Sequence, residues 1–137
     1  MVKTMEQTDR KRSILLVDDD KDFLFQLRAQ FEAAGYDVLV AHDGKKAVEI
    51  LAGTRPDVAV LDLMMEKADM GFTLCYKIKK KDPTIPVIMV TSVTRETGID
   101  FDATTKEERS WIKADALLDK PVRFEQLQQT IARLMKD

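Results

Sequence analysis

Carboxylates, a hydroxyl and an amine occur at equivalent places in this sequence, although they lie far apart along the chain. Each directly follows a short apolar run: Asp18, Asp19 and Asp20 follow the first, Asp62 the third, Thr91 and Ser92 the fourth, and Asp119 and Lys120 the fifth. If the runs are parallel strands of one sheet, their carboxyl ends lie at one edge, where ligands bind in this kind of sheet. The spacing therefore predicts one polar site assembled from several segments.

The chemistry of such a site depends on its charge. Carboxylates crowded into one crevice repel one another and stay ionised together only when a cation joins them. Oxygen ligands favour a hard cation, and a small open site that handles phosphate favours Mg²⁺. Lys120 would add a further positive charge. This arrangement suits a carboxylate that attacks a phosphoryl group, because the positive charges screen the phosphoryl oxygens. A single aspartate at a strand end is more often a cap or turn residue, which is how we interpret Asp20 and Asp43.

Two kinds of segment alternate along the chain and must position these residues. Short apolar runs rich in β-branched residues are typical of strands buried on both faces. They cover residues 14–17, 38–40, 58–61, 87–90 and 116–118. Apolar stripes with helical spacing lie between and after them. The stripes are Phe23, Leu27 and Phe31; Ala47, Val48 and Leu51; Phe72, Leu74, Cys75 and Ile78; and Phe124, Leu127, Ile131, Leu134 and Met135.

Residues at the ends of these segments agree with the alternation. Asp20 and Asp43 can cap the first two helices, and Gly35 can end the first. Asp82-Pro83 ends the third helix, and Pro121 begins the last helical region. Strands that alternate with helices through right-handed crossovers predict an α/β fold. We expect a doubly wound, five-stranded parallel sheet with helices on both faces.

Composition excludes several other classes of protein. A length of 137 residues suits one domain, and 22 basic against 24 acidic residues give a net charge of −2, which disfavours direct nucleic-acid binding. One cysteine and one histidine provide neither a disulfide framework nor a structural zinc site. No apolar run approaches the roughly 18 residues of a membrane span, and the N-terminus lacks an apolar signal region. We therefore expect no membrane insertion and a cytoplasmic location.

The chain divides into an arm and one domain. Residues 1–12 lack periodicity and predict a mobile N-terminal arm, which leaves 13–137 as the domain. No sequence follows Asp137, so we expect a stand-alone domain whose output depends on contacts with other proteins. Residues 91–114 are the irregular part. There Thr105 and Glu108 form a candidate capping box that predicts a short helix after a long loop.

Four motifs, in this order, resemble the receiver domain of two-component response regulators. They read ILLVDDD at residues 14–20, VLDLMM at 60–65, PVIMVTS at 86–92 and LDKPV at 118–122. The resemblance covers nearly all of residues 13–136. It implies a flavodoxin-like receiver fold, with partners that are a sensor histidine kinase or phosphotransfer protein and an unidentified output protein. It also implies a phosphoacceptor switch rather than an enzyme in the usual sense.

The resemblance implies a role for each site residue. Asp62 would accept a phosphoryl group from a phosphohistidine on the kinase. Asp19 and Asp62 would bind Mg²⁺ directly, Asp18 would act mainly through water, and the backbone carbonyl of Met64 would be the remaining protein ligand. No separate general base is required, because an aspartate is ordinarily ionised at about pH 7.

Two further residues would respond to the phosphoryl group. Lys120 would pair with Asp62 before phosphorylation and with a phosphoryl oxygen afterwards. Thr91 would hydrogen-bond the phosphoryl group, and the loop that carries it would be the bistable element of the switch. Ser92 would be the small residue that keeps the site open.

Three features depart from the family pattern. Leu117 replaces the aromatic residue usually found three positions before the lysine, so signalling would use another element, for which Phe101 and Trp111 are candidates. The loop at 65–71 lacks the usual proline and has one extra residue. The interval between Thr91 and the lysine is also longer than usual, which makes it the expected site of partner specificity.

Three alternatives remain. A phosphorylation-independent, receiver-like adaptor would keep the fold and signal by its surface alone. A phosphohydrolase with an aspartyl nucleophile would need a second aspartate two residues after the first, where this chain has Met64, which cannot transfer a proton. A nucleotide-binding domain would need a glycine-rich turn after the first strand, where Asp18, Asp19 and Asp20 would repel a pyrophosphate.

Overall fold

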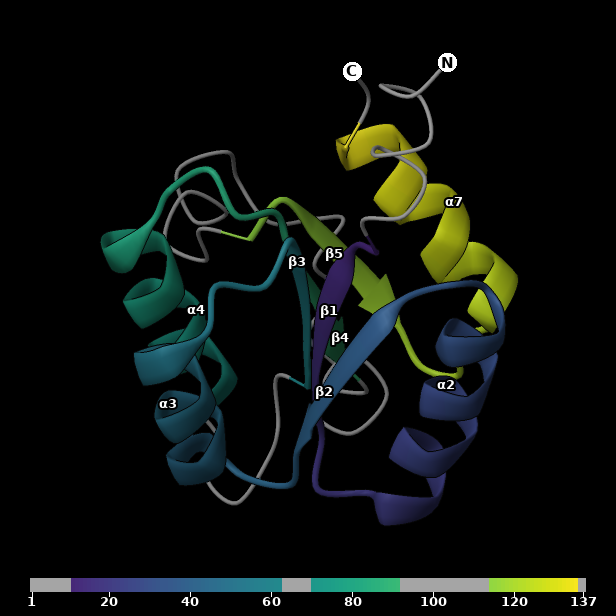
Figure 1. The fold of residues 1–137 in the computed structure, drawn as a ribbon, viewed down its shortest axis with the longest axis horizontal. Coiled ribbons are helices and arrows are strands. Elements are labelled where there is room, and N and C mark those ends of the chain that lie inside the picture. Colours follow the sequence, from purple (N-terminus) through teal and green to yellow (C-terminus); the bar gives the residue numbers. More distant parts are fainter. Residues whose placement is uncertain (1–10, 63–69, 92–113, 136–137) are drawn as a thin grey trace.

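A five-stranded parallel sheet forms the centre of the protein (Figure 1). We describe residues 11–62, 70–91 and 114–135 of a computed structural model. The strands lie in the order β2-β1-β3-β4-β5, and each neighbouring pair is parallel. Their bounds are Ser13–Val17 for β1, Asp37–Ala41 for β2, Val58–Asp62 for β3, Val87–Thr91 for β4 and Ala116–Asp119 for β5. The predicted sheet is confirmed, and each strand is slightly longer than its apolar run.

Helices cover both faces of the sheet, as predicted (Figure 1). α2 and α7 lie on one face, and α3 and α4 lie on the other. Their bounds are Lys21–Ala33 for α2, Gly44–Gly53 for α3, Met70–Lys81 for α4 and Phe124–Leu134 for α7. The Asp20 carboxylate accepts a hydrogen bond from the Phe23 amide, and the Asp43 carboxylate accepts one from the Lys46 amide. Both predicted N-caps are therefore confirmed.

Two apolar layers explain the unbroken apolar runs of the strands. Alternate residues of β1 point to opposite faces, so Ile14 and Leu16 pack beneath α2 and α7 while Leu15 and Val17 pack beneath α3 and α4. β3 and β4 alternate in the same way. A strand covered by helices on both faces has no side that faces solvent. Its residues are therefore apolar at every position instead of alternating between apolar and polar.

One member of the predicted helical stripes is wrong, and a second is less buried than predicted. In α2 the buried residues are Leu24, Leu27 and Phe31, while Phe23 packs only partly buried against the same apolar layer. In α3 the buried side follows Ala47 and Leu51, while Val48 is 41% exposed. Val48 lies next to the buried Ala47 and Phe23 next to the buried Leu24, so each difference is one residue, or about 100° around a helix, and follows from how the helix is rotated against the sheet. That rotation depends on packing that a linear pattern does not specify.

The ends of the other helices agree more closely. Gly35 follows α2 with a φ of +96°, in the region that favours glycine, so it ends the helix as predicted. α4 ends at Lys81, just before Asp82-Pro83. α7 begins at Phe124, a few residues after Pro121.

Several sequence predictions fall outside the described residues. They are residues 1–10 of the predicted arm at 1–12, residues 65–69 of the loop at 65–71, and the capping box at Thr105 and Glu108. None of the described helices is long and apolar enough to cross a membrane.

Candidate functional site

The order of the strands creates a crevice at the carboxyl ends of β1 and β3. β1 lies between β2 and β3, so the connection after β1 leads to one side and the later strands lie on the other. Ligands in open α/β sheets bind at such a switch point. Asp18 follows β1 and Asp62 is the last residue of β3, so both lie at this crevice.

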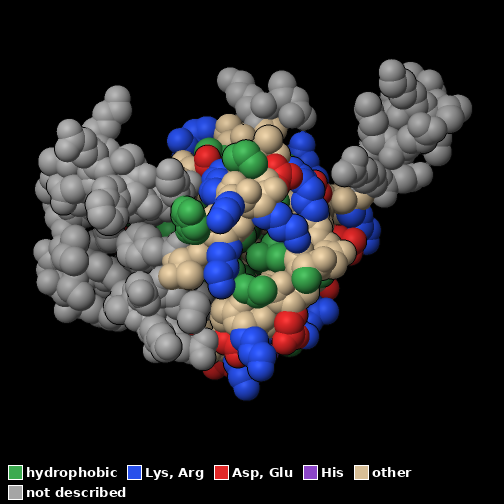
Figure 2. Space-filling view, turned by 90° about the vertical axis from the view of Figure 1, so that its left-hand side faces the viewer, with side chains coloured by type: hydrophobic (Ala, Val, Ile, Leu, Met, Phe, Trp, Pro, Cys, Tyr) green, Lys and Arg blue, Asp and Glu red, His purple; other side chains and the backbone are tan. Residues whose placement is uncertain are grey.

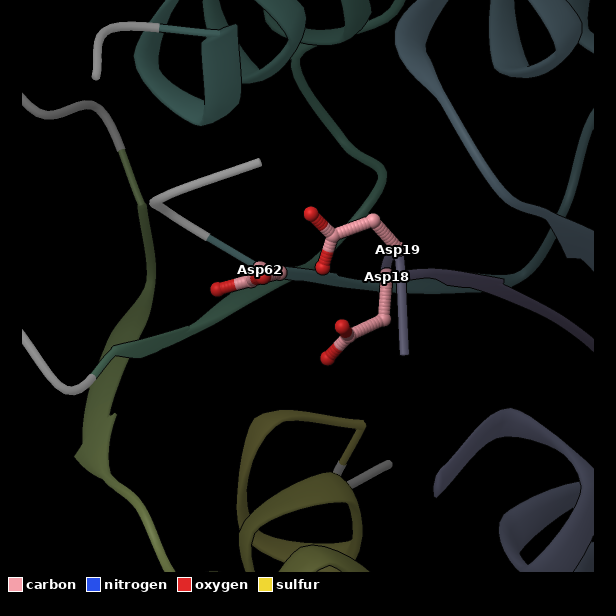
Figure 3. A group of neighbouring side chains, drawn as sticks. All are labelled: Asp18, Asp19 and Asp62. Carbon is pink, nitrogen blue, oxygen red and sulfur yellow. The ribbon is translucent and has the colours of Figure 1, made fainter. Parts of the chain in front are cut away.

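Three carboxylates converge there (Figure 3). Asp18, Asp19 and Asp62 each offer an oxygen, and these oxygens lie within 4.8 Å of one another. The exposed fractions of Asp18 and Asp62 are 2% and 5%, whereas Asp19 is exposed. The cluster is therefore anchored in the interior and open to solvent on one side. This geometry suits a hard divalent cation that keeps part of its water shell.

Lys120 brings a positive charge to the cluster. Its Nζ donates a 2.9 Å hydrogen bond to Asp18 Oδ2 and lies 3.8 Å from Asp62 Oδ2. The expected pairing with Asp62 is present as an ion pair, but the hydrogen bond goes to Asp18. The other Asp18 oxygen accepts a 2.9 Å hydrogen bond from the Asp20 amide, which orients the carboxylate. Burial alone lowers the pKa of Lys120, but the Asp18 hydrogen bond and the charges of Asp18, Asp62 and Asp20 together raise it above its usual value.

Thr91 lies at the same edge of the sheet. It is the last residue of β4 and fully buried, and its backbone carbonyl accepts a 2.8 Å hydrogen bond from the Lys120 amide. Asp62 is paired in register with Val90, the residue before Thr91. The pairing of neighbouring strands thus brings the carboxyl ends of β3, β4 and β5 together. Met64 and Ser92 lie outside the described residues.

Phe23 is a site residue that the sequence analysis assigned to the core. It lies in the first turn of α2, and its ring centroid is 5.0 Å from Lys120 Nζ. A cation at this distance from an aromatic face is attracted by the ring quadrupole. The sequence could have indicated this role, because Phe23 lies four residues after Asp19, on the helix that starts at the crevice. A residue there can contact the site as well as the apolar layer on the sheet.

Leu117 occupies the position where the resemblance leads one to expect an aromatic side chain. It is paired in register with Met89 and packs partly buried against the apolar layer beneath α3 and α4. Phe101 and Trp111, the suggested substitutes, lie outside the described residues.

The arrangement supports one kind of chemistry well. Acidic oxygens at one edge of a sheet can hold a divalent cation, and an ammonium group approaches the same carboxylates. Positive charge on both sides of an incoming phosphoryl group lowers its repulsion from the carboxylates. One of those carboxylates can then act as a nucleophile.

Comparison with known families agrees with this geometry. Residues 14–132 match the family described as response regulator receiver domain. The chain therefore belongs to the receiver domain family of response regulators. The fold and the family inferred from the four motifs are confirmed.

Similar proteins are response regulators. The chain is 35% identical over 127 residues to response regulator MprA of Mycobacterium ulcerans (strain Agy99), and 34% identical over 127 residues to MprA of Mycobacterium tuberculosis (strain ATCC 25618 / H37Rv). Each alignment covers 90% of this chain and 50% of the relative. The chain thus spans about half the length of the curated relatives it matches.

Solved structures share the fold. A putative response regulator from Chloroflexus aurantiacus J-10-fl superposes with a TM-score of 0.76 at 25% identity, covering 93% of this chain and 100% of that one. A CheY-like receiver domain protein from Methanospirillum hungatei JF-1 gives 0.74 at 25%, covering 90% and 93%. TrrA from Thermotoga maritima, solved in complex with Mg(2+)-BeF, gives 0.71 at 24%, covering 90% and 99%.

Proposed function

We propose that this protein is a phosphoacceptor switch of a two-component system, and that Asp62 takes the phosphoryl group in a reaction that requires Mg²⁺. One observation carries the proposal. Asp18, Asp19 and Asp62 present oxygens within 4.8 Å of one another, and Lys120 Nζ lies 2.9 Å from Asp18 Oδ2 and 3.8 Å from Asp62 Oδ2. Membership of the receiver family supports the same chemistry.

In the proposed reaction, a carboxylate oxygen of Asp62 attacks the phosphorus of a phosphohistidine on the donor. The P–N bond breaks as an acyl phosphate forms on Asp62, and the donor nitrogen takes a proton from water. Mg²⁺ bound by Asp19 and Asp62, with Asp18 acting through water and the Met64 carbonyl as a further ligand, would screen the phosphoryl oxygens.

Lys120 and Thr91 sense the new group. The Lys120 ammonium exchanges its hydrogen bond to Asp18 for one to a phosphoryl oxygen, because the phosphoryl group adds charge close to Asp62. The Thr91 hydroxyl moves toward the phosphoryl group and carries the end of β4 with it. The protein acts as a signalling switch, as receiver domains do, and its own catalysis is limited to gaining and losing this phosphoryl group.

The partners in this proposal are a sensor histidine kinase or phosphotransfer protein and an output protein that contacts the receiver surface. We also propose a cytoplasmic location, because the one cysteine is a free thiol buried in the fold and thiols stay reduced in that compartment. It also includes the division into an arm at residues 1–12 and a receiver domain at 13–137.

A receiver-like adaptor that works without phosphorylation is the second candidate. The observation that favours it is Leu117, which lacks the aromatic ring that would couple a moving Thr91 to the surface.

Phosphorylation by acetyl phosphate separates the two candidates. The full chain is incubated with the donor, with and without Mg²⁺, and its intact mass is measured. We expect the mass of one phosphoryl group to be gained only with Mg²⁺ and to be absent in Asp62→Asn. Asp20→Asn is the matched control, because asparagine also caps a helix and the Asp20 carboxylate already serves as the cap of α2. No gain at high donor concentration would overturn the switch and favour the adaptor.

A further inference from the structure

Positive charge is concentrated on the helix layer formed by α3 and α4. These helices carry six lysines, and Glu49 is their only acidic residue. Their net charge is therefore +5, whereas the whole chain carries −2 and the remainder therefore −7. A protein with this polarity presents a basic face that attracts acidic groups, even though its total charge is negative.

A furrow runs between the two helices on that face. Its volume is about 430 Å³; Val48 supplies its exposed apolar surface, and the buried Leu74 forms part of its floor. Lys45 and Glu49 line the side of α3, and Lys77 lines the side of α4. Val48 is 41% exposed, and Tyr76 on α4 is 54% exposed. Figure 2 shows this side of the molecule, where apolar side chains gather in the middle of the described surface with lysine and arginine side chains around them and acidic side chains toward the edges.

Several lysines of the face are available for a partner. Lys79 is engaged by Asp115 at 2.6 Å and by the carbonyl of Ile85 at 2.7 Å, and Lys81 donates to the carbonyl of Leu51. Within the described ranges, Lys45, Lys77 and Lys80 form no ion pair with an aspartate or glutamate. The unpaired ammonium groups thus belong to both helices, α3 and α4.

We propose that this furrow binds an acidic amphipathic helix of a partner protein. Apolar side chains on one face of such a helix would cover Val48 and lie over the floor of the furrow. Carboxylates on the two flanks of the helix would meet Lys45 on one side and Lys77 and Lys80 on the other. Acidic groups on both edges of the ligand would match the lysines present on both flanks of the furrow.

Other polyanions match this surface less well. Glu49 lies in the furrow beside the lysines, within 4.0 Å of Lys46, so a polyanion with closely spaced charges would place some of them next to this carboxylate. Two helical flanks also provide few positive charges for a nucleic acid, whose binding depends on many phosphate contacts. A peptide helix can place a neutral residue opposite Glu49, because its carboxylates can be separated by neutral residues.

The test uses a fluorescein-labelled synthetic helix of about 14 residues. Leucines occupy one face and glutamates flank them, and in the control peptide every glutamate is glutamine. Binding to the full chain is followed by fluorescence anisotropy at low and high salt. We expect saturable binding of the acidic peptide that weakens as salt screens the pairs, and binding at least about tenfold weaker by the glutamine peptide.

Matched variants locate the binding. Lys45→Glu with Lys77→Glu is expected to weaken binding at least about tenfold, since attraction becomes repulsion on both flanks. Val48→Asn should weaken it severalfold without changing charge. Arg28→Glu with Arg133→Glu makes the same charge change on α2 and α7 and should leave affinity within about twofold.

Three results would overturn the proposal. They are equal binding by the Lys45→Glu/Lys77→Glu variant, equal binding of the glutamine peptide, and stronger binding to phosphatidylglycerol vesicles than to the acidic peptide. None of these variants touches the acidic cluster, so Mg²⁺-dependent phosphorylation should persist in all of them. Failure of the furrow proposal is thus distinguished from failure of the proposed phosphoacceptor function.

Discussion

Asp62→Asn should make the metal-free protein more stable, although it removes a group at the centre of the site. In the absence of a divalent cation, Asp62 is repelled by the carboxylates of Asp18 and Asp19 and attracted by Lys120. Asparagine has nearly the same shape and no charge, so the substitution isolates the electrostatic contribution.

The distances give the magnitude. At an effective dielectric constant of about 20, like charges at 4.8 Å, the upper limit for these oxygens, repel by about 3.5 kcal/mol each, and opposite charges separated by 3.8 Å attract by about 4.4 kcal/mol. Losing two repulsions and one attraction leaves a gain of about 2–3 kcal/mol. Because Asp19 is exposed and its charge is screened by water, we reduce this to about 1–2 kcal/mol. For a chain of this length, the midpoint of thermal unfolding should then rise by about 3–8 °C.

Thermal unfolding followed by circular dichroism in EDTA is the assay. Asp37→Asn is the control, since Asp37 is exposed at the start of β2 and should change stability by less than about 0.5 kcal/mol. Added Mg²⁺ should raise the midpoint of the natural sequence and have a much smaller effect on Asp62→Asn. A midpoint in EDTA that is equal to or below that of Asp37→Asn would refute the claim that crowded carboxylates destabilise the metal-free site.

Three further predictions concern other residues. Phe23→Leu should slow phosphorylation by acetyl phosphate about two- to fivefold, because the aromatic ring helps to hold Lys120. Phe23→Tyr keeps the ring and should restore the rate, so equal rates for the two variants would contradict this role. Burial raises the pKa of Cys75 to about 11, so Ellman's reagent at about pH 8 should react at least about 100-fold faster with the protein in urea than with the folded protein. Hydrogen bonds from Thr84 and Arg55 lower the pKa of Asp82 to about 2. The ionised Asp82 therefore stabilises the fold above about pH 4, and this stabilisation is lost as the pH falls toward about 2. The difference in urea midpoint between the natural sequence and Asp82→Asn should shrink over that interval. A difference that stays constant with pH would contradict a stabilising role of the ionised Asp82.

The sheet could be predicted from the sequence because its strands are covered on both faces. Residues 14–17 and 58–61 are unbroken apolar runs for that reason, and each is followed at once by an aspartate. Parallel strands place those aspartates at one edge whatever the details of packing. The convergence of Asp18, Asp19 and Asp62 was therefore predictable without side-chain geometry.

Other features depend on contacts that no linear pattern contains. The rotation of α2 decides that Leu24 is buried and Phe23 only partly buried, and the same rotation places the Phe23 ring near Lys120. The choice of Asp18 as the hydrogen-bond partner of Lys120 depends on the Asp20 amide, which fixes the Asp18 carboxylate. The exposure of Val48 likewise depends on how α3 lies beside α4.

The central claim is that Asp62, and neither of its acidic neighbours, carries the phosphoryl group. The direct measurement is to phosphorylate the full chain with acetyl phosphate and Mg²⁺, reduce the acyl phosphate with borohydride, and locate the resulting homoserine by peptide mass spectrometry. The account predicts homoserine at position 62 alone, and none when Mg²⁺ is withheld. Homoserine at position 18 or 19, or an unmodified Asp62 after exhaustive treatment, would contradict it.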